Sequence, residues 1–221
     1  MLTQEMLAIA TAASIWDTGN KVLYALCAQH PNHTKDDEII AKVWLIGRAY
    51  AAAIERTKPS KKLKAGNSAD DSAVIAGDDF YTSRVAPMIR NSEIDQWTQP
   101  LKTFSSITCD NCEVITGVHK KVMDLFSQIS GLDKRSLASK YLHFHFPQLF
   151  FIFDSRACVG IQKFSKVTGR AKRARNSNAD NEYRKLVEKC LSLVECIKST
   201  HNAELSPRQI DNLLLYAAEK T

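Results

Sequence analysis

The chain contains little glycine and proline. Among its 221 residues there are eight Gly and six Pro, too few for a loop-rich β-sandwich or a low-complexity chain. Hydrophobic residues make up 44% and charged residues 24%, which is the ordinary balance of a globular protein and argues against a disordered one. A chain of this length can bury a core as one domain. The low glycine and proline content therefore favours a helical fold.

Long apolar runs and an export signal are also missing. No apolar run approaches the length of a membrane span. The first residues, MLTQEMLAIATAASIWDTG, have no basic segment and include two acidic residues, unlike a secretory signal. We therefore expect a cytoplasmic protein that does not enter a membrane, with its six cysteines reduced. The single Cys-x-x-Cys, Cys109 to Cys112, lacks a second closely spaced pair, so we expect no metal and no cofactor.

Apolar residues recur mainly at helical spacing. No convincing pair of strands is present, and residues 57–78 and 166–179 read as exposed connections. We therefore expect one compact all-α domain over residues 1–221. The expected helices cover residues 4–28 with a break near 17–20, a long segment after Thr34 that reaches Arg56, and residues 79–90, 93–104, 112–130, 134–146, 155 onward, 181–199 and 207 onward.

The most informative segment is GLDKRSLASKYLHFHFPQLFFIFDSRA, residues 131–157. Two predicted helices meet at Gly131, and an apolar connection then carries Asp154 to the start of the next helix. A carboxylate in this position can cap that helix. It can also point into a cleft as a catalytic group. The segment thus offers one candidate active-site residue and a structural alternative for it.

This segment resembles the helix-hairpin-helix DNA glycosylase superfamily. In that family a hairpin of two helices is followed by an apolar connection that ends in Val-Asp-Thr-His or a related motif. Here Phe153-Asp154-Ser155-Arg156 stands in that place, and Ala138 lies sixteen residues before Asp154, a spacing like that of the family. The resemblance implies an all-helical fold with two helical subdomains around a cleft.

The resemblance also assigns roles to residues of the hairpin element, which spans about 112–146. Asp154 matches the catalytic Asp, which stabilises positive charge on the deoxyribose and helps to bring in the nucleophile. The position of the Schiff-base lysine of lyase-active members is Ser136 here, which favours a monofunctional enzyme that uses water. Lys140 lies one turn later on the same helix face and is a second candidate for the lysine's role.

Basic residues around Asp154 predict contacts with DNA phosphates. The family hairpin carries Gly-x-Gly, whereas this chain has Gly131-Leu132-Asp133. The interval between Asp154 and Asp180 contains basic residues and no acidic one. Basic residues that bind phosphates release counterions from DNA, although basic runs are often only solvated loops. The predicted DNA contacts are Gly131, Lys134, Arg135, Ser136, Arg156, Lys163, Lys166, Arg170, Lys172, Arg173 and Arg175.

These observations together predict a base-excision enzyme. We expect a monomer that binds double-stranded DNA and extrudes a damaged or modified base into a pocket lined by Tyr141, Phe151 and Trp97. The same chemistry would serve DNA repair or defence against a phage with modified bases. The alternatives are a non-catalytic helical DNA-binding protein and a helical interaction module whose net charge of +6 is incidental.

Overall fold

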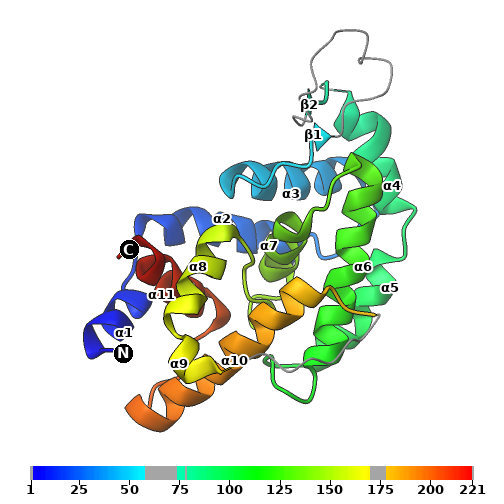
Figure 1. Ribbon diagram of the computed structural model, residues 1–221. Helices are drawn as coiled ribbons and strands as arrows, with labels where there is room; N and C mark the ends of the chain where they lie inside the picture. The colour runs from blue at the N-terminus through cyan, green and yellow to red at the C-terminus, as the bar shows by residue number, and fades with distance from the viewer. Residues whose placement is uncertain (1, 58–73, 78, 170–177, 221) are drawn as a thin grey trace, which may run out of the picture.

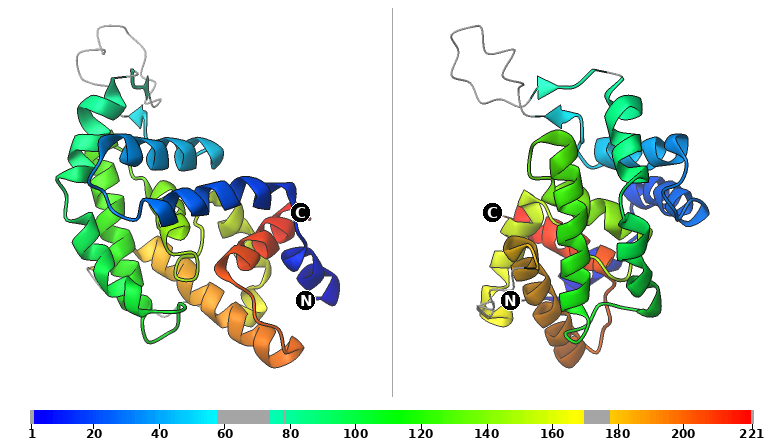
Figure 2. Two further views of the ribbon diagram at one scale, coloured as in Figure 1. Left: turned by 180° about the vertical axis from the view of Figure 1, so that it is seen from behind. Right: turned by 90° about the vertical axis from the view of Figure 1, so that its right-hand side faces the viewer.

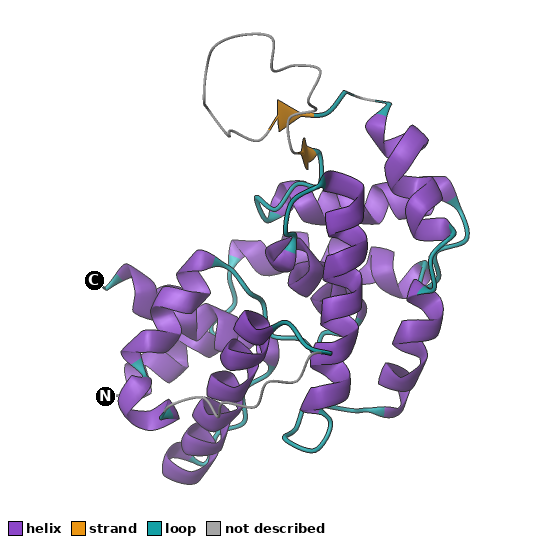
Figure 3. Ribbon diagram, turned by 45° about the vertical axis from the view of Figure 1, so that its right-hand side comes forward, coloured by secondary structure: helices purple, strands orange, loops and turns teal. Residues whose placement is uncertain are grey.

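The computed structural model describes residues 2–57, 74–77, 79–169 and 178–220, and it is almost entirely helical (Figures 1 and 3). Besides the α-helices there are a π-helical segment, η2 (Tyr81–Val85), and a 3-10 segment, η3 (Gln99–Thr103). The α-helices are α1 (Gln4–Thr11), α2 (Ile15–Gln29), α3 (Asp36–Ala49), α4 (Ala86–Arg90), α5 (Ile94–Thr98), α6 (Cys112–Ser130), α7 (Arg135–His145), α8 (Ser155–Lys163), α9 (Ser165–Thr168), α10 (Asn181–His201) and α11 (Pro207–Glu219).

Local sequence signals account for most helix ends. Asp180 caps α10, and Ser206 caps α11 in a capping box with Pro207 at the first helical position, as the sequence predicts. Gly131 ends α6 in the left-handed conformation at φ 75°, which glycine adopts without a steric cost. The all-α prediction is therefore confirmed, and its best-placed boundaries are those with a capping residue.

Three sequence expectations about local structure were wrong. The break in the first helical segment lies between Thr11 and Ile15, where Ser14 and Asp17 form a capping box, and not near residues 17–20. The third helix ends at Ala49 and does not reach Arg56, because Ala51 takes a positive φ of 50°. In addition, β1 (Arg56–Thr57) and β2 (Val74–Ile75) pair antiparallel over two residues each, a contact too short to leave a sequence signal.

The helices pack in two groups. In one group α7 lies against α2, α3 and α6, and α4 packs on α3 and α6. In the other, α11 lies against α8 and α1, and α10 lies against α8 and α9 (Figures 1 and 2). The two chain ends lie on one side of the molecule because α1 packs on α11. The connection from α7 to α8 leads from the first group into the second.

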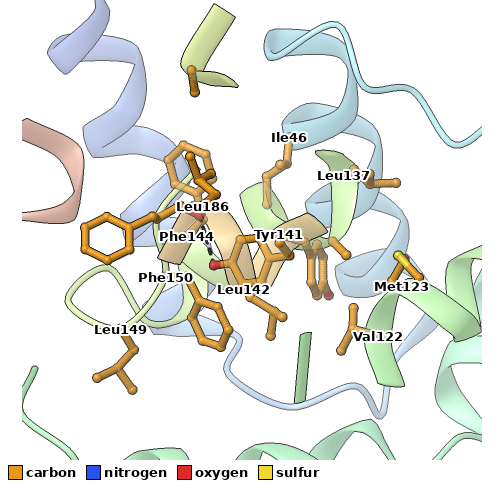
Figure 4. Close-up of a cluster of buried hydrophobic side chains, with 14 of the residues drawn as sticks. Ile46, Val122, Met123, Leu137, Tyr141, Leu142, Phe144, Leu149, Phe150 and Leu186 are labelled. Carbon is orange, nitrogen blue, oxygen red and sulfur yellow. Dashed lines mark hydrogen bonds between the residues drawn. The ribbon is translucent and has the colours of Figure 1, made fainter. Parts of the chain in front are cut away.

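The core contains the hairpin formed by α6, Gly131 and α7. Phe126 of α6 packs edge-to-face on Tyr141 of α7, with ring centroids 5.5 Å apart, and Ile129 and Leu137 are buried in the same core. Figure 4 shows Val122 and Met123 of α6 in one cluster with Leu137 and Tyr141 of α7. By contrast, Trp16 and Trp44 are 70% and 43% exposed. None of the helices in the described ranges is long and apolar enough to cross a membrane.

Candidate functional site

Two opposite charges meet where the hairpin leads into α8. The ammonium Nζ of Lys140, on α7, lies 3.4 Å from the carboxylate Oδ2 of Asp154. Asp154 is the N-cap of α8, and its Oδ1 accepts the backbone N–H of Ala157 at 2.9 Å. One carboxylate oxygen therefore caps the helix while the other faces Lys140. The capping and charge-pairing roles of Asp154 coexist in this structure.

Lys140 is held from several sides. Its Nζ donates to Oγ of Ser136 at 3.0 Å and to the carbonyl of Tyr50 at 3.2 Å. Burial lowers the pKa of Lys140, while Asp154 opposes that shift. The Lys140 side chain is only 3% exposed, compared with 25% for Asp154. Asp154 is therefore the member of the pair that solvent, or a ligand, can reach.

A second pair of opposite charges comes from α11. Nη1 of Arg208 lies 2.5 Å from Oδ2 of Asp211, and the Asp211 side chain is 3% exposed. Asp211 interacts electrostatically with Asp154 and Lys140. We call Lys140, Asp154, Arg208 and Asp211 the charge cluster. Its members come from α7, the start of α8 and α11, so the cluster lies where the two groups of helices meet.

Sequence reasoning missed the α11 half of the charge cluster, although a signal was present. In the last helix Asp211 occupies the same face as Pro207 and Leu214, at helical spacing, and all three residues are buried. A carboxylate on the apolar face of an amphipathic helix requires a buried partner or a function. Counting acidic and basic residues along the chain did not reveal Asp211, because a count does not show which face of a helix a residue occupies.

Several buried polar atoms around the charge cluster lack hydrogen-bond partners among the described residues. Oδ1 of Asn20 accepts the hydroxyl of Tyr50 at 2.6 Å, which connects α2 to the residue whose carbonyl holds Lys140. Nδ2 of Asn20, Nε of Arg208 and Oδ1 of Asp211 have no partner there. Native proteins leave few buried polar atoms without a partner. Three such atoms belong to residues that form or adjoin the charge cluster.

Burial raises the pKa of Asp211 to about 7; Arg208 opposes this shift and Asp154 adds to it. Between the ordinary pKa of an Asp and this value, the folded protein holds a proton that the unfolded chain has lost. The free energy of unfolding should therefore fall as the pH rises from about 4 to 7, by at most about 1.4 kcal/mol per pH unit. Urea unfolding across this range should show a flatter pH dependence for Asp211→Asn, while Glu219→Gln on the same helix should keep the wild-type slope.

Two of the predicted DNA-binding residues, at the start of α7, form hydrogen bonds or an ion pair with other groups of the protein. Nζ of Lys134 donates to the carbonyls of Ala53 and Arg56 at 2.9 and 2.7 Å, and burial lowers its pKa to about 8. The guanidinium of Arg135 pairs with Asp180, the N-cap of α10. Both cations therefore connect α7 to other parts of the fold.

Replacing Lys134 with Met should destabilise the protein. The change leaves the carbonyls of Ala53 and Arg56 without their charged donor, so we expect the free energy of unfolding to fall by about 2 kcal/mol. Urea unfolding measures this loss. The exposed Lys163 offers a matched control, because Lys163→Met should leave the free energy of unfolding unchanged. An unchanged stability for Lys134→Met would contradict the assignment.

The basic residues after Asp154 lie partly on the surface of α8 and α9. Lys163 and Lys166 are exposed, and the exposed Arg156 pairs with Glu219 of α11. Arg156 lies on α8, the helix that Asp154 caps. Of the predicted contacts in the hairpin, Gly131 ends α6 at the turn, and the hydroxyl of Ser136 accepts a hydrogen bond from Lys140. Four predicted contacts, Arg170, Lys172, Arg173 and Arg175, fall outside the described residues.

The three aromatic residues predicted for a base pocket are not gathered in one place. Tyr141 is fully buried, and its hydroxyl lies 2.6 Å from Nε2 of His33. Figure 4 draws Tyr141 in the same cluster as other buried core side chains. Phe151 is also buried, and its carbonyl accepts the hydroxyl of Tyr183. Trp97 instead lines a separate surface cavity of about 660 Å³ between the α4–α5 region and α6.

The hydrogen bond of Tyr141 helps to fix α7, the helix that carries Lys140. His33 bridges Tyr141 and Asp95, with its Nδ1 2.6 Å from Oδ1 of Asp95. Burial lowers the pKa of His33 to about 4, so the ring is neutral at pH 7 and can accept from Tyr141 while donating to Asp95. These two hydrogen bonds tie α7 to α5 and to the segment before α3.

The site thus contains a buried lysine, a partly exposed carboxylate at a helix N-terminus, and a second buried ion pair on α11. The residues that form it come from positions 20 to 211, and the pair of Lys140 and Asp154 spans the end of the hairpin. Comparison of the chain with models of known protein families, with curated proteins and with solved structures finds no match.

Proposed function

We propose that this protein is a DNA glycosylase-like enzyme that excises a damaged or modified base from double-stranded DNA by N-glycosidic hydrolysis, with Asp154 as the catalytic carboxylate. The observation that carries the proposal is the contact between Lys140 and Asp154, which follows directly after the α6–α7 hairpin. In the proposed architecture the two groups of helices are two subdomains, and substrate reaches Asp154 at their junction.

The geometry suits the chemistry of glycosidic bond cleavage. Loss of the base leaves an oxocarbenium-like sugar, and a nearby carboxylate stabilises that positive charge more strongly as the transition state is approached. Asp154 is exposed enough to lie beside a sugar, whereas Lys140 is enclosed. The bond from Ala157 fixes Oδ1 of Asp154, so the carboxylate is held in place before substrate arrives. Stabilisation of the sugar cation by Asp154 does not need a metal.

Binding of duplex DNA would use the surface around the start of α8. Arg156, Lys163 and Lys166 lie on α8 and α9, within fifteen residues of Asp154, and the left-handed Gly131 provides an open turn at the hairpin. Exposed cations contribute the sequence-independent part of DNA affinity by releasing counterions. A protein that binds DNA in this way should lose affinity steeply as salt is raised.

Base release is the direct test. The protein is incubated with a panel of duplexes that each carry one modified base, including hypermodified phage DNA, and alkali then cleaves any abasic site. We expect an alkali-labile product from at least one duplex. If no duplex in a broad panel gives such a product, the enzyme proposal fails.

The second candidate function is a non-catalytic DNA-binding protein. It is favoured by the capping bond from Ala157 to Asp154, which gives that carboxylate a structural role independent of any reaction. This candidate predicts salt-dependent binding to duplex DNA without base release. Binding with no salt dependence would exclude both candidates and leave a helical interaction module.

A further inference from the structure

The surface cavity beside Trp97 is lined by residues of α4, α5, α6 and the turn between α4 and α5, and none of them belongs to the charge cluster. Its volume is about 660 Å³, and its apolar part consists of Pro87, Met88, Trp97 and Leu125. Cavities of roughly 300 to 1,000 Å³ with an apolar lining and a few polar groups are typical of small-molecule sites. This cavity is therefore a second place where the protein can hold a ligand.

Trp97 is held in place by two charged neighbours. Its indole Nε1 donates to Oε2 of Glu93 at 3.2 Å, and Nζ of Lys121 lies 5.8 Å from the centroid of the ring. The second distance is near the outer limit of a cation–π interaction, and Lys121 is exposed. The hydrogen bond fixes the indole, whereas the ammonium can move away from it. A flat ring can then stack on Trp97.

The charges at the cavity are balanced. The carboxylate of Glu93 accepts the indole N–H of Trp97, and Asp124 forms an ion pair with Lys120 on its own helix. Together with Lys121, the two lysines match the two carboxylates in number. Binding partners carry potentials that complement their site, so these surroundings favour an uncharged ligand over an anion or a cation.

Two side-chain amides complete the lining. Asn91, which follows α4, and Gln128 of α6 are exposed at the cavity, and their amides make no hydrogen bond with another described residue. An amide presents a donor beside an acceptor. That pair matches the acceptor N7 and the amino group N6 of adenine, which Asn and Gln bind with two hydrogen bonds. Purine rings also stack well on aromatic side chains.

We propose that this cavity binds an uncharged 6-aminopurine, as the free base or the nucleoside, with the purine ring stacked on Trp97 and the amides of Asn91 and Gln128 at its amino edge. This inference goes beyond the proposed function and does not rest on it. The cavity is a binding site and not a second reaction site, because Glu93 and Asp124 already have partners within the protein.

The test is an NMR titration of the full-length, ¹⁵N-labelled protein without DNA. The indole signal of Trp97 is identified by its absence in Trp97→Phe, and that of Trp44 by its absence in Trp44→Phe. We expect adenine or adenosine to shift the Trp97 signal saturably, with a Kd of about 0.1 mM, and to leave the Trp44 signal of α3 in place. The absence of a saturable shift with both compounds would overturn the inference.

A variant of an exposed residue tests the amides without risk to folding. Gln128→Met should weaken adenosine binding about tenfold, because two hydrogen bonds to the purine edge are lost. Purine riboside, which lacks the amino group, should bind the wild-type protein more weakly by a similar factor. Gln96→Met is the matched control, since Gln96 is exposed on α5 and does not line the cavity. Equal adenosine affinities in the two variants would reject the assignment of the purine edge.

A third variant separates this cavity from the charge cluster. Asp154→Asn should bind adenosine as the wild-type protein does, because Asp154 does not line the cavity. A loss of binding in a folded Asp154→Asn protein would place the purine elsewhere and refute the inference. Absence of base release from modified duplexes would reject the proposed function alone, since the titration contains no DNA.

Discussion

Replacing Asp154 with Asn should reduce base release by about 10²- to 10³-fold or more, because the substitution removes the negative charge that stabilises the developing sugar cation. Asn is as good an N-cap residue as Asp, so the bond to the N–H of Ala157 can be kept. Duplex binding should therefore stay close to wild type, and thermal unfolding should show only the loss of the ion pair with Lys140. Alkali treatment of the duplex that gives product with the wild-type protein measures the loss.

The chain provides a matched control in Asp180. Like Asp154, Asp180 caps a helix with its carboxylate and pairs with a cation of the α7 region, in this case Arg135. Asp180→Asn therefore removes a charge from an equivalent structural setting without touching the charge cluster. We expect it to retain base release. Equal activity in the two variants would mean that Asp154 only caps α8, and the non-catalytic candidate would then be favoured.

Replacing Gly160 with Ala should cause a large loss of stability. A Cβ on Gly160 would lie 2.1 Å from the carbonyl oxygen of Leu214 and 2.9 Å from its Cα, and these are backbone atoms that cannot turn away. Helices α8 and α11 must therefore move apart. We expect the free energy of unfolding to fall by about 3 kcal/mol and the melting temperature by roughly 10 °C, as measured by urea and thermal unfolding.

Gly19 is the corresponding control. It lies within helix α2, is exposed, and has no atom within 4 Å of the position that its Cβ would take. Gly19→Ala should be neutral or stabilising by up to about 1 kcal/mol, because Ala has the higher helix propensity. If Gly160→Ala is as stable as Gly19→Ala, then α8 and α11 are not packed as closely as the structure shows.

The sequence by itself determined the helical class and much of the hairpin. Periodic apolar residues predict α6 and α7, and Gly131 predicts their junction, because these signals act between residues a few positions apart. Asp154 was identified for the same reason, as a carboxylate at a recognisable helix start. The break at Ser14 was misplaced, although Ser14 and Asp17 form a capping box there.

Only the tertiary structure decided which charges are buried and which partners they have. Lys134 and Lys163 look alike in the sequence, yet one is buried against two carbonyls and the other is exposed. Arg135 and Asp180 lie 45 residues apart in the chain and form an ion pair in the fold. The reason is physical: a charge's pKa and pairing depend on distances and burial in space, and these arise only when helices from distant parts of the chain pack together.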